Sequence, residues 1–456
     1  MSFLKLNYFL RFILLFVFAI LFLFSCSDDD DMSIETTDFW YTPEKGYVLE
    51  RRGNNYKLYG TSTSGCVLID NDLRSENYAG IAFNEFGDQL IGSSELLAGN
   101  INFNRLINVD EYCDLNMLAQ TNDPEVNFQY FWDIFNDYYA FFELRNVNWQ
   151  DKLALKTTVN PNTLYDVLER MILPLQDGHV SIVNEDLDIN SNRAHLLEII
   201  NSNLSPNDHI ETTDALISIL NQRISFINST YLNNATNSDS NGNMVWGLLT
   251  EDVGYFNVIS MEGYAAIDKE LSTVDDLMTE IMQDVAAANV DKLVIDLRFN
   301  TGGHDGVSLE IASRFVTSTR NVFTKKAKIK NGFTDKQTIS LVPKGDYQFT
   351  GDIVLLTSPV TASAAEIFVL CLKDLPNVTI VGQNTNGAFS EILTHRLPNG
   401  TFIGLSNQIY ADNAGNVFEG IGIGPVQEEN EIPFLSSPDF INSIDSGIER
   451  SLAILE

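Results

Sequence analysis

Apolar and polar positions follow two different periods along this chain, and each period predicts a different kind of region. Over residues 39–118 the apolar positions form short alternating runs between glycine- and asparagine-rich turns, which predicts a small β-rich domain. In residues 125–139 aromatic side chains recur at helical spacing. We expect a helix there whose aromatic face packs into the core, since such a stripe is far more often core than a ligand platform.

From residue 244 onward, apolar runs and helical patterns alternate. Buried strands are predicted at 253–259, 292–298 and 353–356, and a helix is predicted after each of them. This alternation indicates a core sheet with helices packed against it, so the predicted fold class is α/β. Upstream of this core, residues 122–186 contain the aromatic helix and a second helix, and residues 187–243 show polar, amphipathic helical patterns.

The first 25 residues have the pattern of an export signal. Lys5 and Arg11 precede an unbroken apolar run at 12–24, and a bare transmembrane anchor is the alternative, although the run is shorter than the ~20 residues of a span. The residues up to Cys26 resemble a bacterial lipoprotein cleavage box. Ser27 and the aspartates after it resemble the acidic signal that sends some Bacteroidetes-type lipoproteins to the outer face of the outer membrane.

We therefore expect lipidation of Cys26, an acidic tether over residues 26–38, and an outer membrane lipoprotein on the periplasmic or cell-surface face, with the surface favoured. In an exported protein Cys66 and Cys113 could form a disulfide within the β-rich domain. Cys371 lies on an apolar helix face and is expected to be a buried thiol. No cysteine and histidine spacing resembles a zinc site, so no metal is expected.

Composition limits the class of partner. The chain has 456 residues, 44% of them apolar and 20% charged, as in a globular protein of about two to three domains. Its formal charge of −34 leaves no basic excess to neutralise phosphates, which argues against a nucleic-acid partner.

Ser363 lies where a buried strand gives way to a helix. Backbone N–H groups are unpaired at such a junction and the helix dipole is positive, so a tetrahedral oxyanion could be held there. The commoner role of a serine in this place is to cap the helix. Taken alone, the stretch favours a cap, formed by Ser363 or by Thr361.

Two other segments carry residues that could do chemistry. Gly302 and Gly303 follow the strand at 292–297, and paired glycines let a backbone present bare N–H groups to a ligand, although an ordinary strand-ending turn has the same pattern. His179 lies where an Asp-Gly turn enters a short strand. A phosphate loop is unlikely, because its lysine is missing.

Together these segments resemble the S41 peptidases, the tail-specific or C-terminal processing proteases, and most closely the branch that includes the tricorn core protease. The matching segments occur in the family's order within about residues 122–430, and they are 175–181 (LQDGHVS), 293–303 (LVIDLRFNTGG), 361–367 (TASAAEI), 381–387 (VGQNTNG), 397–400 (LPNG) and 420–425 (GIGIGP). The resemblance implies a ClpP/crotonase-like α/β sheet with flanking helices over 244–456, and a serine peptidase that needs no cofactor.

The resemblance also implies roles for single residues. Ser363 matches the nucleophile, and the N–H groups of Ala364 and of Gly302 or Gly303 match the oxyanion hole. In the Ser/Lys branch a lysine follows the glycine that Gly387 matches, but here Ala388 stands in that place. Lys373 cannot replace it, because it lies about 15 Å along the helix from the serine.

The base therefore falls on His179, as in the tricorn-like branch, and the acid that orients it falls on Glu391. Asp177 is more simply a turn former. His395 is the best competitor for the base, and His304 could enter the site as a substrate contact. His195 and His209 look solvated.

The predicted function is that of a lipid-anchored serine endopeptidase that acts on a peptide or protein through an acyl-enzyme and a Ser-His-Glu triad. The alternative is a catalytically silent surface lipoprotein that binds peptides or glycans in the same cleft. Residues 187–243 lack the carboxylate-binding loop of a PDZ domain, so specificity for C-terminal tails is not implied. The oligomeric state is left open.

Overall fold

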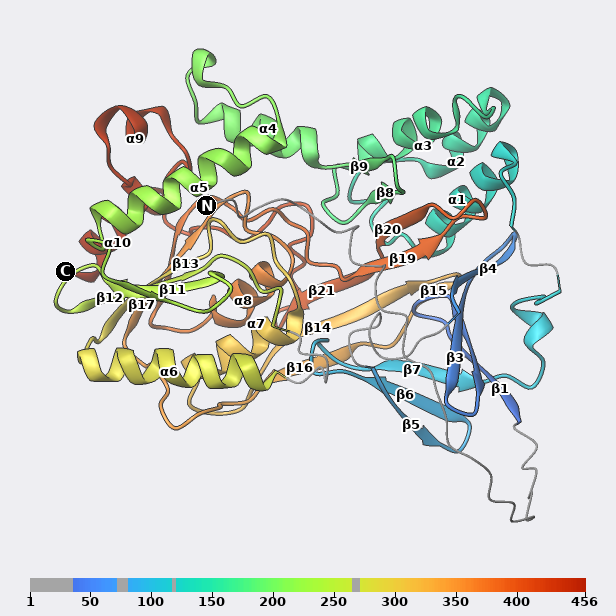
Figure 1. Cartoon of the computed structure of the whole chain (residues 1–456), viewed down its shortest axis with the longest axis horizontal. Coiled ribbons are helices and arrows are strands. Elements are labelled where there is room, and N and C mark those ends of the chain that lie inside the picture. The colour runs from blue at the N-terminus through green and yellow to red at the C-terminus, as the bar shows by residue number, and fades with distance from the viewer. Residues whose placement is uncertain (1–35, 72–80, 117–119, 265–270) are drawn as a thin grey trace, which may run out of the picture.

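The computed structural model describes residues 36–71, 81–116, 120–264 and 271–456. The predicted export signal, Cys26 and the predicted tether up to residue 35 lie outside the described residues. Among the described helices, none is both long and apolar enough to cross a membrane. Figure 1 shows the N-terminal sheet beside the part that contains the core sheet, with the strand β14 (Arg320–Ile329) reaching from one to the other.

The N-terminal domain is one antiparallel sheet in the order β4-β3-β2-β1-β7-β6-β5. Its strands are β1 (Thr37–Thr42), β2 (Tyr47–Arg52), β3 (Asn55–Ser62), β4 (Gly65–Asp70), β5 (Ala82–Phe86), β6 (Gln89–Ser93) and β7 (Ile101–Arg105), followed by the 3-10 turn η1 (Val109–Glu111). A disulfide joins Cys66 in β4 to Cys113, so the pairing that the sequence allowed is confirmed.

The core sheet has six strands in the order β10-β11-β12-β13-β17-β18. Its strands are β10 (Thr236–Ser238), β11 (Met244–Leu248), β12 (Val253–Val258), β13 (Lys292–Asp296), β17 (Asp352–Thr357) and β18 (Val378–Gly382). The first three pair antiparallel, and the last four pair parallel. The apolar runs at 253–259, 292–298 and 353–356 are therefore strands, as the hydrophobic pattern predicted.

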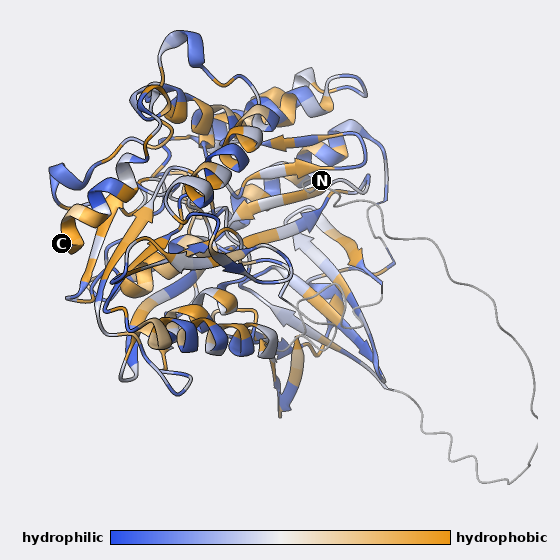
Figure 2. Ribbon diagram, turned by 60° about the vertical axis from the view of Figure 1, so that its left-hand side comes forward, coloured by the Kyte–Doolittle hydropathy of each residue, from blue (hydrophilic) through white to orange (hydrophobic). Residues whose placement is uncertain are grey.

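Helices cover both faces of the core sheet, and this explains why its strands are apolar without interruption. Successive side chains of a strand point to opposite faces. Leu293 and Ile295 pack in the cluster that contains α6 (Ser272–Ala288), α7 (Asp305–Ala312) and α8 (Ala364–Leu372), whereas Val294 packs with α4 (Arg193–Ser202), α5 (Thr213–Thr230) and α10 (Ser446–Leu455). Figure 2 shows largely hydrophobic strands beside helices in which hydrophobic and hydrophilic residues alternate.

The helical region before the core sheet packs on the N-terminal domain. The aromatic stripe lies on α1 (Pro124–Tyr138), where Phe128, Phe131 and Phe135 are fully buried, so its prediction as core is confirmed.

The remaining helical elements of the described chain are α2 (Trp149–Lys152), η2 (Leu153–Thr158), α3 (Leu164–Ile172), η3 (Leu173–Leu175), η4 (Pro206–Asp208), η5 (Ser313–Phe315), η6 (Glu428–Asn430) and α9 (Ser437–Asn442).

Two small antiparallel sheets connect these parts. One has the order β19-β20-β8-β9, from β19 (Ile392–Arg396), β20 (Phe402–Ser406), β8 (Ser181–Val183) and β9 (Asp188–Asn190). In the other, β14 pairs with β15 (Gly332–Phe333), β16 (Gln337–Leu341) and β21 (Gln408–Asp412). In the first of these sheets β8 pairs with β20. This pairing places the turn before β8, which carries His179, beside a strand that lies about forty residues after Ser363 in the sequence.

Candidate active site

The loops that follow the parallel strands all leave the core sheet at one edge. The carboxyl ends of parallel strands meet there, and this edge is where ligands bind in open α/β folds. The glycine pair follows β13, the turn that carries Ser363 follows β17, and the segment 383–391 follows β18. Strand order therefore brings together three of the segments that the sequence singled out.

Ser363 lies directly before α8, with φ 56° and ψ −126°. An ordinary N-cap residue has an extended backbone, and a positive φ is sterically unfavourable for serine. Strain of this kind costs about 1–3 kcal/mol and clusters at active sites, where the surrounding structure enforces it. The other candidate cap, Thr361, donates its hydroxyl to the Leu297 carbonyl at 2.8 Å. Ser363 is also the N-cap of α8, and its N–H donates to the Glu366 side chain as in a capping box. Its positive φ sets it apart from a plain cap and favours an additional, functional role.

Two backbone amides beside Ser363 are free to bind an anion. Across the described part of the chain, the N–H groups of Ala364 and Gly303 have no intramolecular acceptor, whereas the Gly302 N–H donates to Asn300 Oδ1 at 2.7 Å. Gly302 has φ 108°, and a Cβ on it would lie 2.6 Å from Ser363 Cβ. Gly302 therefore permits the close approach of the two loops, beside which the N–H groups of Gly303 and Ala364 stay unbonded among the described residues.

Asn300 joins three loops of the site, a role that the sequence did not reveal. Besides accepting from Gly302, its side chain donates through Nδ2 to the Val258 carbonyl at 2.9 Å. Its own carbonyl accepts from the Ala362 N–H at 3.1 Å. Asn300 is fully buried and fixes the glycine pair relative to Ser363. The available signal was an amide side chain directly after an apolar strand, where backbone groups need partners.

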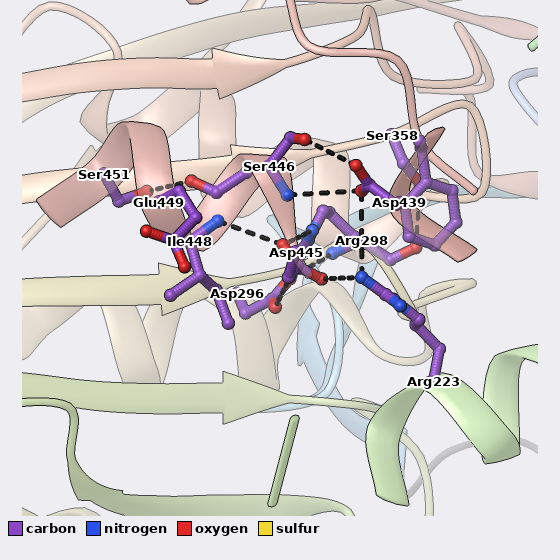
Figure 3. Close-up of polar contacts among 12 residues, drawn as sticks. Arg223, Asp296, Arg298, Ser358, Asp439, Asp445, Ser446, Ile448, Glu449 and Ser451 are labelled. Carbon is purple, nitrogen blue, oxygen red and sulfur yellow. Dashed lines mark hydrogen bonds and ion pairs between the residues drawn. The ribbon is translucent and has the colours of Figure 1, made fainter. Parts of the chain in front are cut away.

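A buried ion-pair network anchors the end of β13 (Figure 3). Arg298 contacts Asp296 Oδ2 at 2.6 Å and Asp445 Oδ1 at 2.8 Å. From α5, Arg223 contacts the other oxygen of Asp445 at 3.1 Å. Because a buried charge is costly to leave unpaired, this network holds α10 against the strand that leads into the glycine pair.

Glu366 is a second residue whose role the sequence did not reveal. Its fully buried carboxylate accepts four hydrogen bonds, from the Thr385 hydroxyl at 2.6 Å and from the N–H groups of Gly387 at 2.7 Å, Ala388 at 2.8 Å and Ser363 at 3.1 Å. Burial raises its pKa to about 7, although these hydrogen bonds act in the opposite direction. Glu366 fastens the start of α8 to the segment after β18.

His179 follows a turn that packs on that same segment. A Cβ on Gly178 would lie 3.1 Å from Asn386 Oδ1 and 3.2 Å from Ala388 Cβ, so the turn before the histidine packs on the segment directly. The side chain is nearly buried, with 7% exposed, and in the described residues its Nδ1 has no hydrogen-bond partner. An imidazole with an unused nitrogen can accept a proton.

The surroundings of His179 favour its neutral form. Burial lowers the pKa of His179, and this effect is opposed by the charge of Asp177, by the Ser390 backbone and by the charge of Glu391. Asp177 accepts the backbone N–H of His179 at 2.9 Å, so it shapes the turn as the sequence predicted. A lowered pKa keeps the imidazole neutral at neutral pH, the state that a general base requires.

Glu391 is held by partners other than the histidine. Its Oε1 contacts Lys45 Nζ at 2.7 Å, and its Oε2 accepts from Gln408 Nε2 at 3.2 Å and faces Lys325 Nζ at 3.7 Å. Burial acts to raise the pKa of Glu391, but the charges of the two lysines outweigh it and lower the pKa to about 2. No hydrogen bond joins Glu391 to His179 among the described side chains, and the Glu391 charge raises the pKa of His179 less than the charge of Asp177 does.

The competing histidines lie in other surroundings. His395 Nε2 contacts the Lys45 carbonyl at 3.0 Å, and its ring stacks on Tyr138, so it packs against the N-terminal domain and α1. His304 precedes α7 directly after the glycine pair and is half-buried. His209 is exposed and His195 half-buried, on the helical segment.

The described residues contain no direct hydrogen bond between Ser363 and His179. Both are linked to the segment 385–390: Ser363 through Glu366, and His179 through the Ser390 backbone and through Gly178, which packs near Asn386 and Ala388. Hydrogen bonds between catalytic groups are often long in unliganded sites and tighten with substrate. Where a lysine base would stand, Ala388 is buried, and Lys373 pairs with Asp374 and Asp412.

A cavity of about 580 Å³ lies elsewhere, at the opposite edge of the core sheet. Trp246, Gly254 and Leu293 line it, the last two at the amino-terminal ends of β12 and β13. It is therefore separate from the loops around Ser363. In the residues that the structure describes, no group of three or more histidine, cysteine or acidic side chains could hold a metal ion.

Residues 252–428 match the model of peptidase family S41. The carboxy-terminal-processing protease of Bartonella bacilliformis is 25% identical over 174 residues, which are 38% of this chain and 38% of that protein. The carboxy-terminal processing protease CtpA of Bacillus subtilis is 23% identical over 181 residues, covering 39% of this chain and 38% of the relative. The match thus spans less than two fifths of either relative.

Two solved structures share the fold of the larger part of the chain. A protein of Parabacteroides merdae, solved as a candidate peptidase, aligns with 73% of this chain and 96% of its own, with a TM-score of 0.58 and 23% identity. Mature CPAF in complex with lactacystin covers 73% of this chain and 97% of its own, with a TM-score of 0.51 and 12% identity. The α/β core with a helical subdomain and an N-terminal β-rich sheet is confirmed as the fold class.

Proposed function

We propose that this chain is a lipid-anchored serine peptidase that hydrolyses peptide bonds, because its residues 252–428 match the model of peptidase family S41. The observation that carries the proposal is the strained positive φ of Ser363 between two unbonded amides, those of Ala364 and Gly303. A serine held in this way on a strand-to-helix turn has the arrangement of a nucleophile rather than of a cap.

In the proposed mechanism Ser363 Oγ attacks the carbonyl carbon of the peptide bond while His179 takes the hydroxyl proton. The carbonyl oxygen becomes an oxyanion that accepts hydrogen bonds from the N–H groups of Ala364 and Gly303. One such donor contributes about 2.7–4 kcal/mol to transition-state stabilisation. His179 then gives the proton to the leaving amine. In the second half of the reaction water attacks the acyl carbon and gives a proton to His179, and His179 returns a proton to Ser363 Oγ as the carboxylic acid leaves.

Glu391 is the acid of the proposed triad. Its negative charge favours the imidazolium that forms on His179 during both proton transfers, and its low pKa keeps that charge present throughout the useful pH range. Asp177 adds a second negative charge near the ring. The proposed catalytic set is therefore Ser363, His179 and Glu391.

Hydrolysis of an unfolded protein tests the proposed activity. The full chain is expected to cut a substrate such as reduced, alkylated casein into fragments with new N-termini, and mass spectrometry of the products reads out cleavage. A folded wild-type protein that binds such chains without cleaving them would instead establish the silent, peptide-binding lipoprotein.

We also propose that Cys26 carries the lipid anchor and that the protein is displayed on the cell surface. The Cys26→Ser variant, expressed in a lipoprotein-processing bacterium, is expected to lose metabolic labelling by a palmitate analogue and to leave the membrane fraction. Equal labelling of the variant and the wild type would contradict the anchor. Digestion of intact cells by an added protease distinguishes the surface from the periplasmic face.

A further inference from the structure

We propose that the turn between β1 and β2 of the N-terminal domain supports the catalytic site. In this turn Lys45 is the positioning residue that holds Glu391. The inference rests on the proposed function, since it assigns a partner to the proposed triad acid. It also gives the N-terminal domain a role that its sequence did not reveal.

The turn is buried, although its tip is charged. Glu44 is 7% exposed and Lys45 is 4% exposed, whereas charged residues are almost never so fully buried unless they are paired. Gly46 has φ 64°, and a Cβ on it would lie 2.2 Å from Tyr138 Oη. Only a glycine permits this approach, so the backbone of the turn is built to lie against α1.

Three polar contacts tie the turn to the part of the chain that follows Ser390. Lys45 Nζ contacts Glu391 Oε1 at 2.7 Å, and the Lys45 carbonyl contacts His395 Nε2 at 3.0 Å. The Glu44 carbonyl accepts from Asn407 Nδ2 at 2.6 Å. Glu391 lies directly before β19, His395 lies within it, and Asn407 lies between β20 and β21. The turn therefore contacts both ends of the β19–β20 hairpin.

Lys45 is the closest cation to Glu391. Lys325 lies farther away, at 3.7 Å, and Gln408 contributes an uncharged hydrogen bond. Five further ionisable groups interact with Lys45 or Glu391, and they are Glu44, His179, Asp305 at the start of α7, His395 and Tyr410. Burial raises the pKa of Asp305 to about 6 and lowers the pKa of His395 to about 4.

Loss of Lys45 is therefore expected to move the titration of Glu391. Burial acts to raise the pKa of that carboxyl, and the charges of Lys45 and Lys325 lower it. Without Lys45 the pKa rises, so Glu391 takes up its proton at a higher pH and His179 loses a supporting negative charge there. The acid limb of the pH profile is expected to shift upward.

The test compares Lys45→Met with Lys45→Arg and with Lys57→Met, a half-exposed lysine on β3 of the same domain. We expect Lys45→Met to lower kcat/KM by roughly tenfold and to raise the pH at which activity falls on the acid side. Lys45→Arg is expected to restore the profile in part, and Lys57→Met to behave as the wild type. A folded Lys45→Met protein with the wild-type profile would overturn the proposal.

A double-mutant cycle keeps the test decisive. If Lys45 acts through Glu391, the Lys45→Met and Glu391→Gln changes are non-additive, and the double variant is no worse than Glu391→Gln alone. Additive losses would show that Lys45 acts in another way. If the wild type is inactive, the proposed function fails. A ¹³C NMR titration of the Glu391 carboxyl in the wild type and in Lys45→Met still shows whether the lysine lowers the pKa of Glu391.

Discussion

Ser363→Ala is expected to lower kcat for peptide hydrolysis by about 10⁴- to 10⁶-fold, because a nucleophile cannot be replaced by the remaining groups of the site. The fold should survive the change. An alanine has almost the same size, and Ser363 is half-buried before α8. Steady-state hydrolysis of a fluorogenic peptide measures the loss, and circular dichroism with a thermal scan reports the fold.

Ser436 supplies the matched control. It lies at the N-terminus of α9 with an extended backbone, and its hydroxyl accepts from the Asp439 N–H at 3.3 Å, so it is a plain helix cap. Ser436→Ala is expected to cost about 0.5–2 kcal/mol of unfolding free energy and to leave activity intact. If Ser363→Ala behaved in the same way, Ser363 would be a cap and not a nucleophile.

His179→Gln is expected to lower kcat by about 10³-fold or more, whereas His395→Gln should lower kcat/KM by less than about tenfold. Both changes replace an imidazole by an amide of similar size. His395 packs on Tyr138 and bonds to the Lys45 carbonyl, so its loss should act mainly on stability. If His395→Gln abolished hydrolysis and His179→Gln did not, His395 would be the base.

The pH dependence follows from the same environment. Because burial lowers the pKa of His179, the imidazole stays neutral to a lower pH than a solvent-exposed histidine, and it loses its function as a base when protonated below that value. Hydrolysis by the wild type should therefore persist below the usual histidine range. Activity that already falls as the pH drops through neutral would contradict the buried, neutral base.

The hydrophobic pattern was sufficient for the central strands β12, β13 and β17 of the core sheet. The buried strand β17 leaves a short, uninterrupted apolar run at 353–356. The edge strand β10 was not predicted, because it is polar and mostly exposed and lies within 187–243, where helical patterns were expected. The long strand β14 leaves a weaker signal, because three of its four residues at 325–328 are lysines. The C-terminal helices α9 and α10 were also not predicted. Their attachment through Asp445 to Arg298 is a tertiary contact with no local signal.

The candidate site was predictable where backbone conformation decides the residue type. The glycine pair and the strand-to-helix serine leave such signals, since Gly302 must approach Ser363 closely. Glu366 and Asn300 left only weak signals, a Ser-x-x-Glu spacing and an amide after an apolar strand, because their hydrogen bonds form only once three loops meet. The same holds for Lys45, whose partner Glu391 lies far along the chain.

The covalent reaction of Ser363 with an active-site probe tests the central claim most directly. The folded full-length protein is treated with a fluorophosphonate, digested and mapped by mass spectrometry, with heat-unfolded protein as the control for chemical reactivity alone. The account predicts a single modified peptide that carries the phosphonyl group on Ser363, lost on unfolding and strongly reduced in His179→Gln. Folded protein that cleaves peptides but carries no label on Ser363, or carries it on another residue, would contradict the assignment.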